Sequence, residues 1–200
     1  MISIWRQEGR SLIRIDSPEP NCWIHVSSPN NYEISRLVNE FSLDLDILND
    51  ILDIDEQSRT EKEDGKILFL MRMPVYIPDR EVPYFTVPLG IVFFDTMLMT
   101  ICLQDGEVIR DLLESRVKNF SLTNRKTFLL TIFFRSSFYY LRYLKDINRK
   151  TTGIEKELQK AIKNNELIQL LTMEKSLVFF TTSLKTNELL LEKIQKTKII

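Results

Sequence analysis

The chain has 200 residues, of which 44% are hydrophobic, enough for one sizeable domain or for a compact domain with an appendage. Lys and Arg together number 27 and Asp and Glu number 28, so the charges almost balance. This balance leaves no surplus of basic side chains to neutralise phosphates, which argues against nucleic acid as a partner.

The sequence carries no recognisable targeting or membrane-spanning segment. Arg6, Glu8 and Arg10 interrupt the region where a signal peptide would have a continuous apolar run. The best candidate for a membrane span, residues 128–134, is closed by Arg135 and is far shorter than the roughly 20 apolar residues that a bilayer requires. We therefore expect the chain as given to be soluble.

The first part of the chain alternates apolar runs with turn residues, a pattern typical of short strands and helices joined by tight loops. A Glu8-Gly9 turn is predicted to join the first two strands into a hairpin. Two short helices are then expected, because apolar residues recur at helical spacing on one face of each. The predicted strands cover residues 2–5, 11–15 and 22–26, and the predicted helices residues 33–41 and 45–52.

A charged segment and a three-stranded meander come next. Residues 53–64 are dense in charge and are interpreted as a solvated face and turn, with an interaction or cation-binding patch as the alternative. Asp64-Gly65 is typical of a tight turn into a long apolar strand, in which Pro74 indicates a sheet edge or a bulge. The predicted strands of the meander cover residues 66–77, 84–94 and 97–103, and a helix is expected over 108–117.

Residues 124–198 are predicted to form two long helices folded back on each other. Apolar residues recur at alternating spacings of three and four in both halves, as in seams between helices. Lys163, Asn164 and Asn165 are expected to form the connection. A helix of about forty residues is roughly 60 Å long, so part of it must project or meet another chain. The seams contain Leu130, Phe133, Ser137, Tyr140, Leu144, Ile147, Thr151, Ile154, Leu158 and Ala161 in the first helix, and Leu170, Met173, Leu177, Phe180, Leu184, Asn187, Leu191 and Ile194 in the second.

Together these patterns predict an α/β domain over residues 1–120, followed by a long antiparallel helical hairpin over residues 121–200. The five glycines are dispersed, and no two fall within ten residues of each other. This spacing excludes the common glycine-rich nucleotide-binding loops.

The residue types that most often carry catalysis are scarce. His25 is the single histidine. It is interpreted as a structural imidazole, because no acid, cysteine or second histidine sits at the sequence spacing of a metal site or a triad. Cys22 and Cys102 lie in apolar, strand-like stretches and are interpreted as reduced core residues, not as a disulfide or as metal ligands.

An enzyme built on this chain would therefore depend on carboxylates alone. A metal-dependent hydrolase using Asp53, Asp55 and Glu56 is disfavoured by their poor spacing, and we expect no enzymatic activity. Asp50 ends a helical segment with a well-defined apolar side, so its carboxylate is expected to point outward, where a neighbour could share it. From the residues alone Asp50 is interpreted as an ordinary surface aspartate, and the function stays open.

Several segments nevertheless follow the order of motifs in one known protein family. They are residues 22–29, 35–43, 46–52, 59–63, 98–101 and 153–158. This series resembles the cytoplasmic part of the CorA-type divalent cation transporters, which carry magnesium and often cobalt. The resemblance covers most of the chain, through motifs that are individually short.

The resemblance implies a mixed β-sheet flanked by helices, with the hairpin laid against the stalk of a homopentamer. It also implies the cytoplasmic portion of an inner-membrane protein. The family's pore lies in membrane helices with a Gly-Met-Asn signature, which is not found in this sequence, and Ile200 falls where the stalk helix would begin. We therefore expect a truncated portion that senses and gates but does not itself conduct ions.

The resemblance further implies a regulatory metal site. In the family, an acid on the short helix pairs with an acid on the stalk of a neighbouring subunit, and the matching residue here is Asp50. The acid that often precedes it is replaced by Asn49, which argues against a second site. Mg²⁺ suits such a place, because it binds through one or two carboxylates while keeping several waters. No prosthetic group is implied.

Two alternatives remain. A zinc transporter of the same superfamily would have the same architecture, and no residue of this sequence selects the ion. A soluble adaptor, whose helical hairpin pairs with a coiled coil of another protein, would equally explain the two seams.

Overall fold

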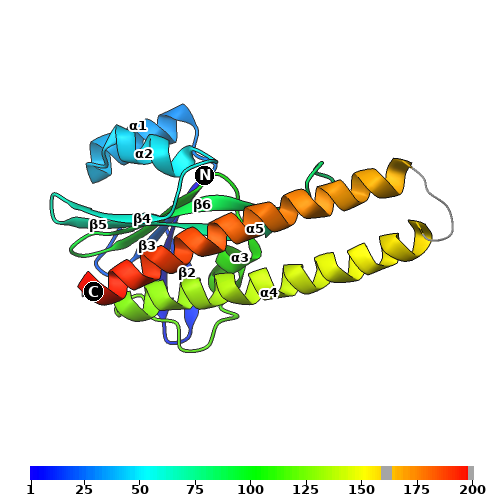
Figure 1. Ribbon diagram of the computed structural model, residues 1–200. Helices are drawn as coiled ribbons and strands as arrows, with labels where there is room; N and C mark the ends of the chain where they lie inside the picture. The colour runs from blue at the N-terminus through cyan, green and yellow to red at the C-terminus, as the bar shows by residue number, and fades with distance from the viewer. Residues whose placement is uncertain (159–163, 198–200) are drawn as a thin grey trace.

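A single mixed sheet forms the centre of the molecule (Figure 1). In residues 1–158 and 164–197, which this computed structural model describes, its strands are β1 (Ile2–Glu8), β2 (Ser11–Ile15), β3 (Trp23–Ser27), β4 (Arg59–Glu63), β5 (Lys66–Tyr76), β6 (Tyr84–Phe93) and β7 (Leu98–Cys102). Their order across the sheet is β2-β1-β3-β7-β6-β5-β4. The strands β3 and β7 run parallel, and the other neighbours are antiparallel. The predicted α/β class and mixed sheet are thus confirmed.

The described helices are α1 (Asn31–Phe41), α2 (Leu45–Leu52), α3 (Glu107–Leu113), α4 (Arg125–Leu158) and α5 (Asn164–Thr197). The first begins with a capping box, in which the Asn30 side chain accepts from the backbone N–H of Glu33 and the Glu33 carboxylate accepts from that of Asn30. The second begins at Asp44, whose carboxylate accepts from the backbone N–H of Asp46. No described helix is long and apolar enough to cross a membrane.

Helices α1 and α2 cover one face of the sheet, and α3 and α4 cover the other (Figure 1). Leu37, Leu48 and Ile51 are fully buried on the first face. The approach of α2 is close enough that a Cβ placed on Gly90 of β6 would lie 2.5 Å from Cδ1 of Ile51. A methyl group at this crossing would therefore force the Ile51 side chain, or the helix that carries it, to shift.

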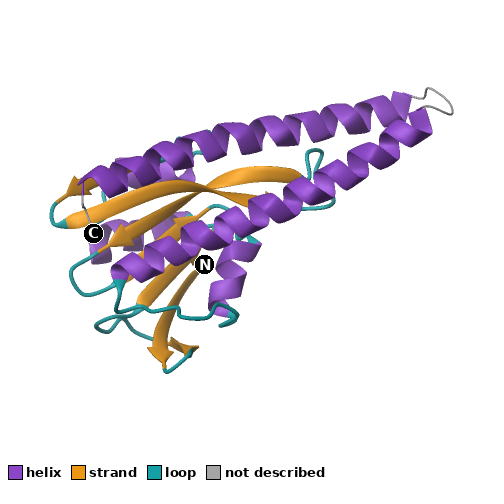
Figure 2. Cartoon of the chain, turned by 60° about the horizontal axis from the view of Figure 1, so that its bottom comes forward, coloured by secondary structure: helices purple, strands orange, loops and turns teal. Residues whose placement is uncertain are grey.

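The long hairpin is confirmed, and Figure 2 shows both helices running along the sheet and extending beyond it. Part of the predicted seam is nevertheless wrong, because Leu130, Leu144, Leu184 and Leu191 are exposed. The buried side chains of α5 are Met173, Ser176, Phe180, Ser183, Asn187 and Leu190. This buried face is rotated from the prediction because α5 packs on the sheet as well as on α4, and the small serines permit a close approach.

The expected connection between the helices is shifted. Asn164 and Asn165 already belong to α5. Lys163 and the predicted seam residue Ala161 lie outside the described residues. The solvated turn expected over residues 53–64 was also partly wrong, because β4 occupies its second half and pairs with β5. Strand pairing overrides the low β propensity of its charged residues.

Helix α5 covers the part of β5 that β4 does not reach. The pairing with β4 ends at Leu70, so the following residues, including Pro74, have no strand on that side, as predicted for an edge. At this edge the Asn187 side chain accepts from the backbone N–H of Arg72 at 2.9 Å and donates to its carbonyl at 2.8 Å. The amide of Asn187 therefore satisfies the two backbone groups that a neighbouring strand would otherwise pair.

Candidate functional site

Asp50 lies on the outer side of α2. Leu48 and Ile51 direct the apolar face of this short helix into the sheet, which leaves Asp50 turned away from the core. Its side chain is 44% exposed. The outward position predicted for this carboxylate is therefore what the structure shows, although its metal-binding role stays a prediction.

Arg59, the first residue of β4, gathers three carboxylates around its guanidinium. Its Nη2 donates to Asp50, its Nη1 to Glu56 and its Nε to Glu61, and each donor–acceptor distance is 2.5 Å. Burial alone would lower the pKa of Arg59, but the hydrogen bond to Glu61 and the three negative charges raise it above its ordinary value. One cation facing three anions leaves two formal negative charges. Sequence reasoning did not join Asp50 to this charged segment; the start of β4 positions Arg59 beside the end of α2.

The net negative charge of this cluster suits a divalent cation, but its side chains do not enclose one. Among the described residues, Asp50 belongs to no group of three donor side chains close enough together to hold a metal. An ion at Asp50 would need ligands from water or from another molecule. Mg²⁺ commonly binds in this way, through one or two carboxylates and several retained waters. Arg59 would compete with the ion for the carboxylate.

The segment between α2 and β4 is hydrogen-bonded directly to α5. The carbonyl of Glu56 accepts from Nη1 of the buried Arg72 at 2.6 Å, and Nε of Arg72 donates to the hydroxyl of Ser183 at 3.0 Å. The hydroxyl of Ser58 donates to the side chain of Asn187 at 2.7 Å. Burial lowers the pKa of Arg72. The acidic cluster and the hairpin are therefore joined by two short polar paths.

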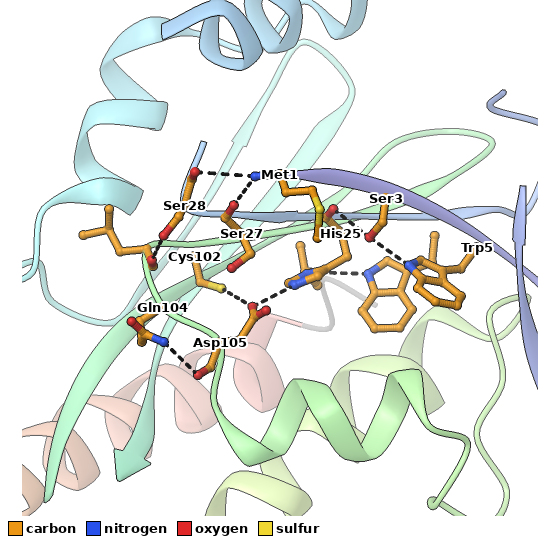
Figure 3. A network of polar contacts seen from close by, with 12 residues as sticks. Met1, Ser3, Trp5, His25, Ser27, Ser28, Cys102, Gln104 and Asp105 are labelled. Atoms are coloured by element: carbon orange, nitrogen blue, oxygen red, sulfur yellow. Dashed lines mark hydrogen bonds and ion pairs between the residues drawn. The ribbon is translucent and has the colours of Figure 1, made fainter. Parts of the chain in front are cut away.

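The structure corrects the reason given for assigning His25 a purely structural role. Cys102, at the end of β7, and Asp105, just before α3, lie beside it (Figure 3). Nε2 of His25 is 3.0 Å from Oδ1 of Asp105, and Sγ of Cys102 is 3.5 Å from the same oxygen. Both cysteines are free and buried, as expected. The parallel pairing of β3 with β7 brings these groups together, and no local spacing in the sequence could have revealed it.

The electrostatics of this second cluster follow from its burial. Burial alone would raise the pKa of Asp105, but the hydrogen bond and the charge of His25, with a further hydrogen bond from Ser27, lower it to about 2. Burial and the adjacent Asp105 carboxylate raise the pKa of the Cys102 thiol well above its ordinary value. At neutral pH the cluster thus contains an ionised carboxylate and a protonated thiol.

Comparison with known proteins establishes the class to which this architecture belongs. A profile described as CorA-like Mg²⁺ transporter protein matches residues 19–199. The chain therefore belongs to the CorA-like Mg²⁺ transporter family, as the sequence motifs predicted, and this is a family of transporters, not of enzymes. No curated protein sequence matches the chain.

Solved structures share the fold at low sequence identity. The complete CorA magnesium transporter of Methanocaldococcus jannaschii superimposes with a TM-score of 0.78 and 20% identity; the match covers 94% of this chain and 60% of the transporter. The soluble domain of that transporter superimposes with a TM-score of 0.80 and 21% identity, and the match covers 96% of this chain and 77% of that domain. The ZntB cytoplasmic domain of Vibrio parahaemolyticus superimposes with a TM-score of 0.72 and 12% identity, and the match covers 98% of this chain and 79% of that domain. Identities this low show a common fold.

Proposed function

We propose that this chain is the cytoplasmic regulatory domain of a divalent cation transporter, and that Mg²⁺ bound at Asp50 controls the gating of the pore. Family membership supports the transporter, and the excess of negative charge around Arg59 supports the cation site. In this proposal the transported ions are Mg²⁺ and Co²⁺, and the protein is anchored in the inner membrane by segments outside residues 1–200.

The proposed mechanism is electrostatic. A bound Mg²⁺ would lie between Asp50 and an acid on a neighbouring subunit, and would neutralise both carboxylates. When the ion leaves, the two like charges repel each other across the subunit interface and favour an open arrangement. Arg59 sets the sensitivity, since its guanidinium already neutralises part of the Asp50 charge and weakens ion binding. The site would therefore respond only at high Mg²⁺ concentration.

The hydrogen bonds beneath the acidic cluster provide a route to the rest of the molecule. A displacement at Glu56 would be felt at Ser183 of α5 through the buried Arg72, and a displacement at Ser58 would be felt directly at Asn187. Such polar contacts have a preferred geometry, so they transmit a shift more faithfully than apolar packing does. In this proposal the hairpin, residues 121–200, is the moving unit, and residues 1–120 are the sensing unit.

The exposed side of the hairpin supports assembly into a homopentamer. A groove of about 1290 Å³ runs between α4 and α5. Its lining includes Leu130, Leu184 and Leu191, which are exposed in the single chain. Apolar side chains in such a groove are typical of a surface that packs against another helix. We propose that the stalk of the assembled transporter covers it.

The test is magnesium inhibition of ion uptake by the complete transporter that carries this domain. Asp50→Ala removes the proposed ligand, so half-inhibition should move to higher Mg²⁺ concentration. Asp46→Ala is the matched control, because Asp46 is an exposed acid on the same helix that makes no ion pair with Arg59. Unchanged inhibition in Asp50→Ala would refute the assignment of the site.

A second variant at the same site should shift the Mg²⁺ concentration of half-inhibition in the opposite direction. Arg59→Gln removes the competing guanidinium and its charge while retaining a polar side chain, so half-inhibition should move to lower Mg²⁺ concentration. A general loss of function would shift the Mg²⁺ concentration of half-inhibition in the same direction in both variants. Opposite shifts would identify a charge effect at Asp50.

Zinc transport is the second candidate, because the chain also shares its fold with the ZntB cytoplasmic domain. Uptake of labelled Zn²⁺, with Mg²⁺ and Co²⁺ as competitors, would decide between the ions. Family membership favours either transporter over a soluble adaptor.

A further inference from the structure

Three side chains with different donor atoms converge at one end of the parallel strand pair. His25 comes from β3, Cys102 ends β7, and Asp105 lies in the turn that leads to α3 (Figure 3). The His25 nitrogen, the Cys102 sulfur and an Asp105 carboxylate oxygen all lie within 4.8 Å of one another. In the described parts of the chain, no other trio of such donors meets this distance. The carboxyl ends of parallel strands are a common place for ligand sites.

We propose that His25, Cys102 and Asp105 form a binding site for a borderline-soft divalent cation, with Zn²⁺ as the best match. Nitrogen, thiolate and carboxylate ligands are the set that zinc takes in proteins. With the thiol deprotonated, the three ligands carry two negative charges, which neutralise a divalent ion. Mg²⁺, which prefers oxygen ligands, is a poor match for this set.

The distances already approach those of a coordinated ion. With Zn–N and Zn–O of about 2.0–2.2 Å and Zn–S of about 2.3 Å, tetrahedral ligand atoms lie about 3.3–3.6 Å apart. The observed separations are 3.0 Å from His25 to Asp105 and 3.5 Å from Cys102 to Asp105. The third separation, from the His25 nitrogen to the Cys102 sulfur, is at most 4.8 Å. Side-chain rotations that open imidazole and carboxylate by a few tenths of an ångström, and bring the thiol to about 3.5 Å from the imidazole, would complete the geometry.

The surroundings orient the imidazole. Nδ1 of His25 lies 2.8 Å from the hydroxyl of Thr100, which also accepts from Nε1 of Trp23 at 2.8 Å. These contacts hold the ring with Nε2 toward Asp105, and the Thr100 hydroxyl can either donate to Nδ1 or accept from it. Metal-bound histidines typically have such a partner on the other nitrogen, because it fixes the tautomer that leaves a lone pair for the metal.

One ligand connects the cluster to solvent. His25 and Cys102 are buried, whereas the Asp105 side chain is 34% exposed. An ion can therefore enter past Asp105, and a water on that side can complete four-coordination. Once bound, the ion would join β3, β7 and the start of α3.

The experiment is a titration of the purified chain with Co²⁺, a spectroscopic substitute for Zn²⁺. Binding should produce the near-ultraviolet charge-transfer band of a cobalt thiolate, and an equivalent of Zn²⁺ should abolish it. Cys102→Ser should lose the band. Cys22→Ser should keep it, because Cys22 is an equally buried free cysteine outside the cluster. Circular dichroism and thermal unfolding would verify that both variants fold.

Asp105→Asn is a milder second variant, because the residue lies partly exposed in a turn. It should weaken Co²⁺ binding more than tenfold, since losing even a residue that only hydrogen-bonds to a metal ligand costs about 10–100-fold in metal affinity. The cobalt–thiolate band should remain in Asp50→Ala and in the presence of excess Mg²⁺. This result would distinguish the His25–Cys102–Asp105 site from the proposed regulatory site at Asp50. Absence of the band in the natural sequence, or its persistence in Cys102→Ser, would show that the three side chains form only a hydrogen-bonded cluster.

Discussion

Helices α1 and α2 rest on the sheet through buried aliphatic side chains, whereas α5 reaches the edge of β5 through an amide, hydroxyls and a guanidinium. Leu37, Leu48 and Ile51 carry the first contact. Asn187 and Ser183 carry much of the second, both bonded to Arg72. Apolar packing supplies free energy with little directional preference, while each hydrogen bond fixes a distance and an angle. The first contact therefore stabilises the fold, and the second specifies where α5 lies along it.

The largest expected effect comes from the apolar contact. Leu48→Ala should lower the free energy of unfolding of the chain by about 3–5 kcal/mol, because a fully buried leucine is lost and a cavity remains. Urea denaturation measures this loss. Leu45→Ala on the same helix, where the leucine is half-exposed, is the control and should change stability little. Equal losses in the two variants would mean that α2 is not seated as described.

An intermediate effect is expected at the polar contact. Asn187→Ala leaves the buried N–H of Arg72 unpaired, which costs about 1–3 kcal/mol. The carbonyl of Arg72 keeps its bond from the Tyr140 hydroxyl, so the loss should stay below that of Leu48→Ala. Glu188→Ala, next to it on the exposed side of α5, should have no comparable effect. Hydrogen exchange at the Arg72 amide would accelerate only in Asn187→Ala.

The smallest effect is expected at the exposed groove. Leu184 is 43% exposed in the single chain, so Leu184→Ala should cost less than about 1 kcal/mol. Urea denaturation at several protein concentrations would test this. A loss above about 2 kcal/mol would show that the groove is already covered, and a concentration dependence of that loss would identify a second copy of the chain as the cover.

The apolar framework of this molecule was predictable from its sequence, and the polar contacts largely were not. Strand runs and helical spacing predicted most of the sheet, both short helices and the hairpin, because hydrophobic periodicity reports directly on burial. The strand at Arg59–Glu63 was missed, since its charged residues fit a solvated turn equally well. The seam of α5 was misplaced because Ser176 and Ser183 carry no hydrophobic signal, although both are buried.

The candidate sites likewise combine a feature that the sequence predicted with contacts that it could not predict. The outward position of Asp50 follows from the periodicity of α2, a local property of eight residues. Its pairing with Arg59 depends on where β4 begins, and the meeting of His25 with Cys102 depends on a parallel pairing between strands remote in sequence. A single sequence contains no local trace of such pairings. Sequence spacing alone therefore gave the wrong reason for setting His25 aside.

Asn187 also anchors α5 at the edge of the sheet, and the arm of the helix from there to Asn164 is packed through Phe180 and Met173. From Asn187 to Asn164 the helix extends about 35 Å at 1.5 Å per residue. Rotation about this pivot by about 5° would carry the far end through about 3 Å, enough to make or break a contact there. The loop at Ser58 bonds to α5 at Asn187, so a tilt of the helix imposed there grows toward the far end in proportion to the distance. The length of this arm thus sets the amplitude of the motion, independently of the strength of its anchor.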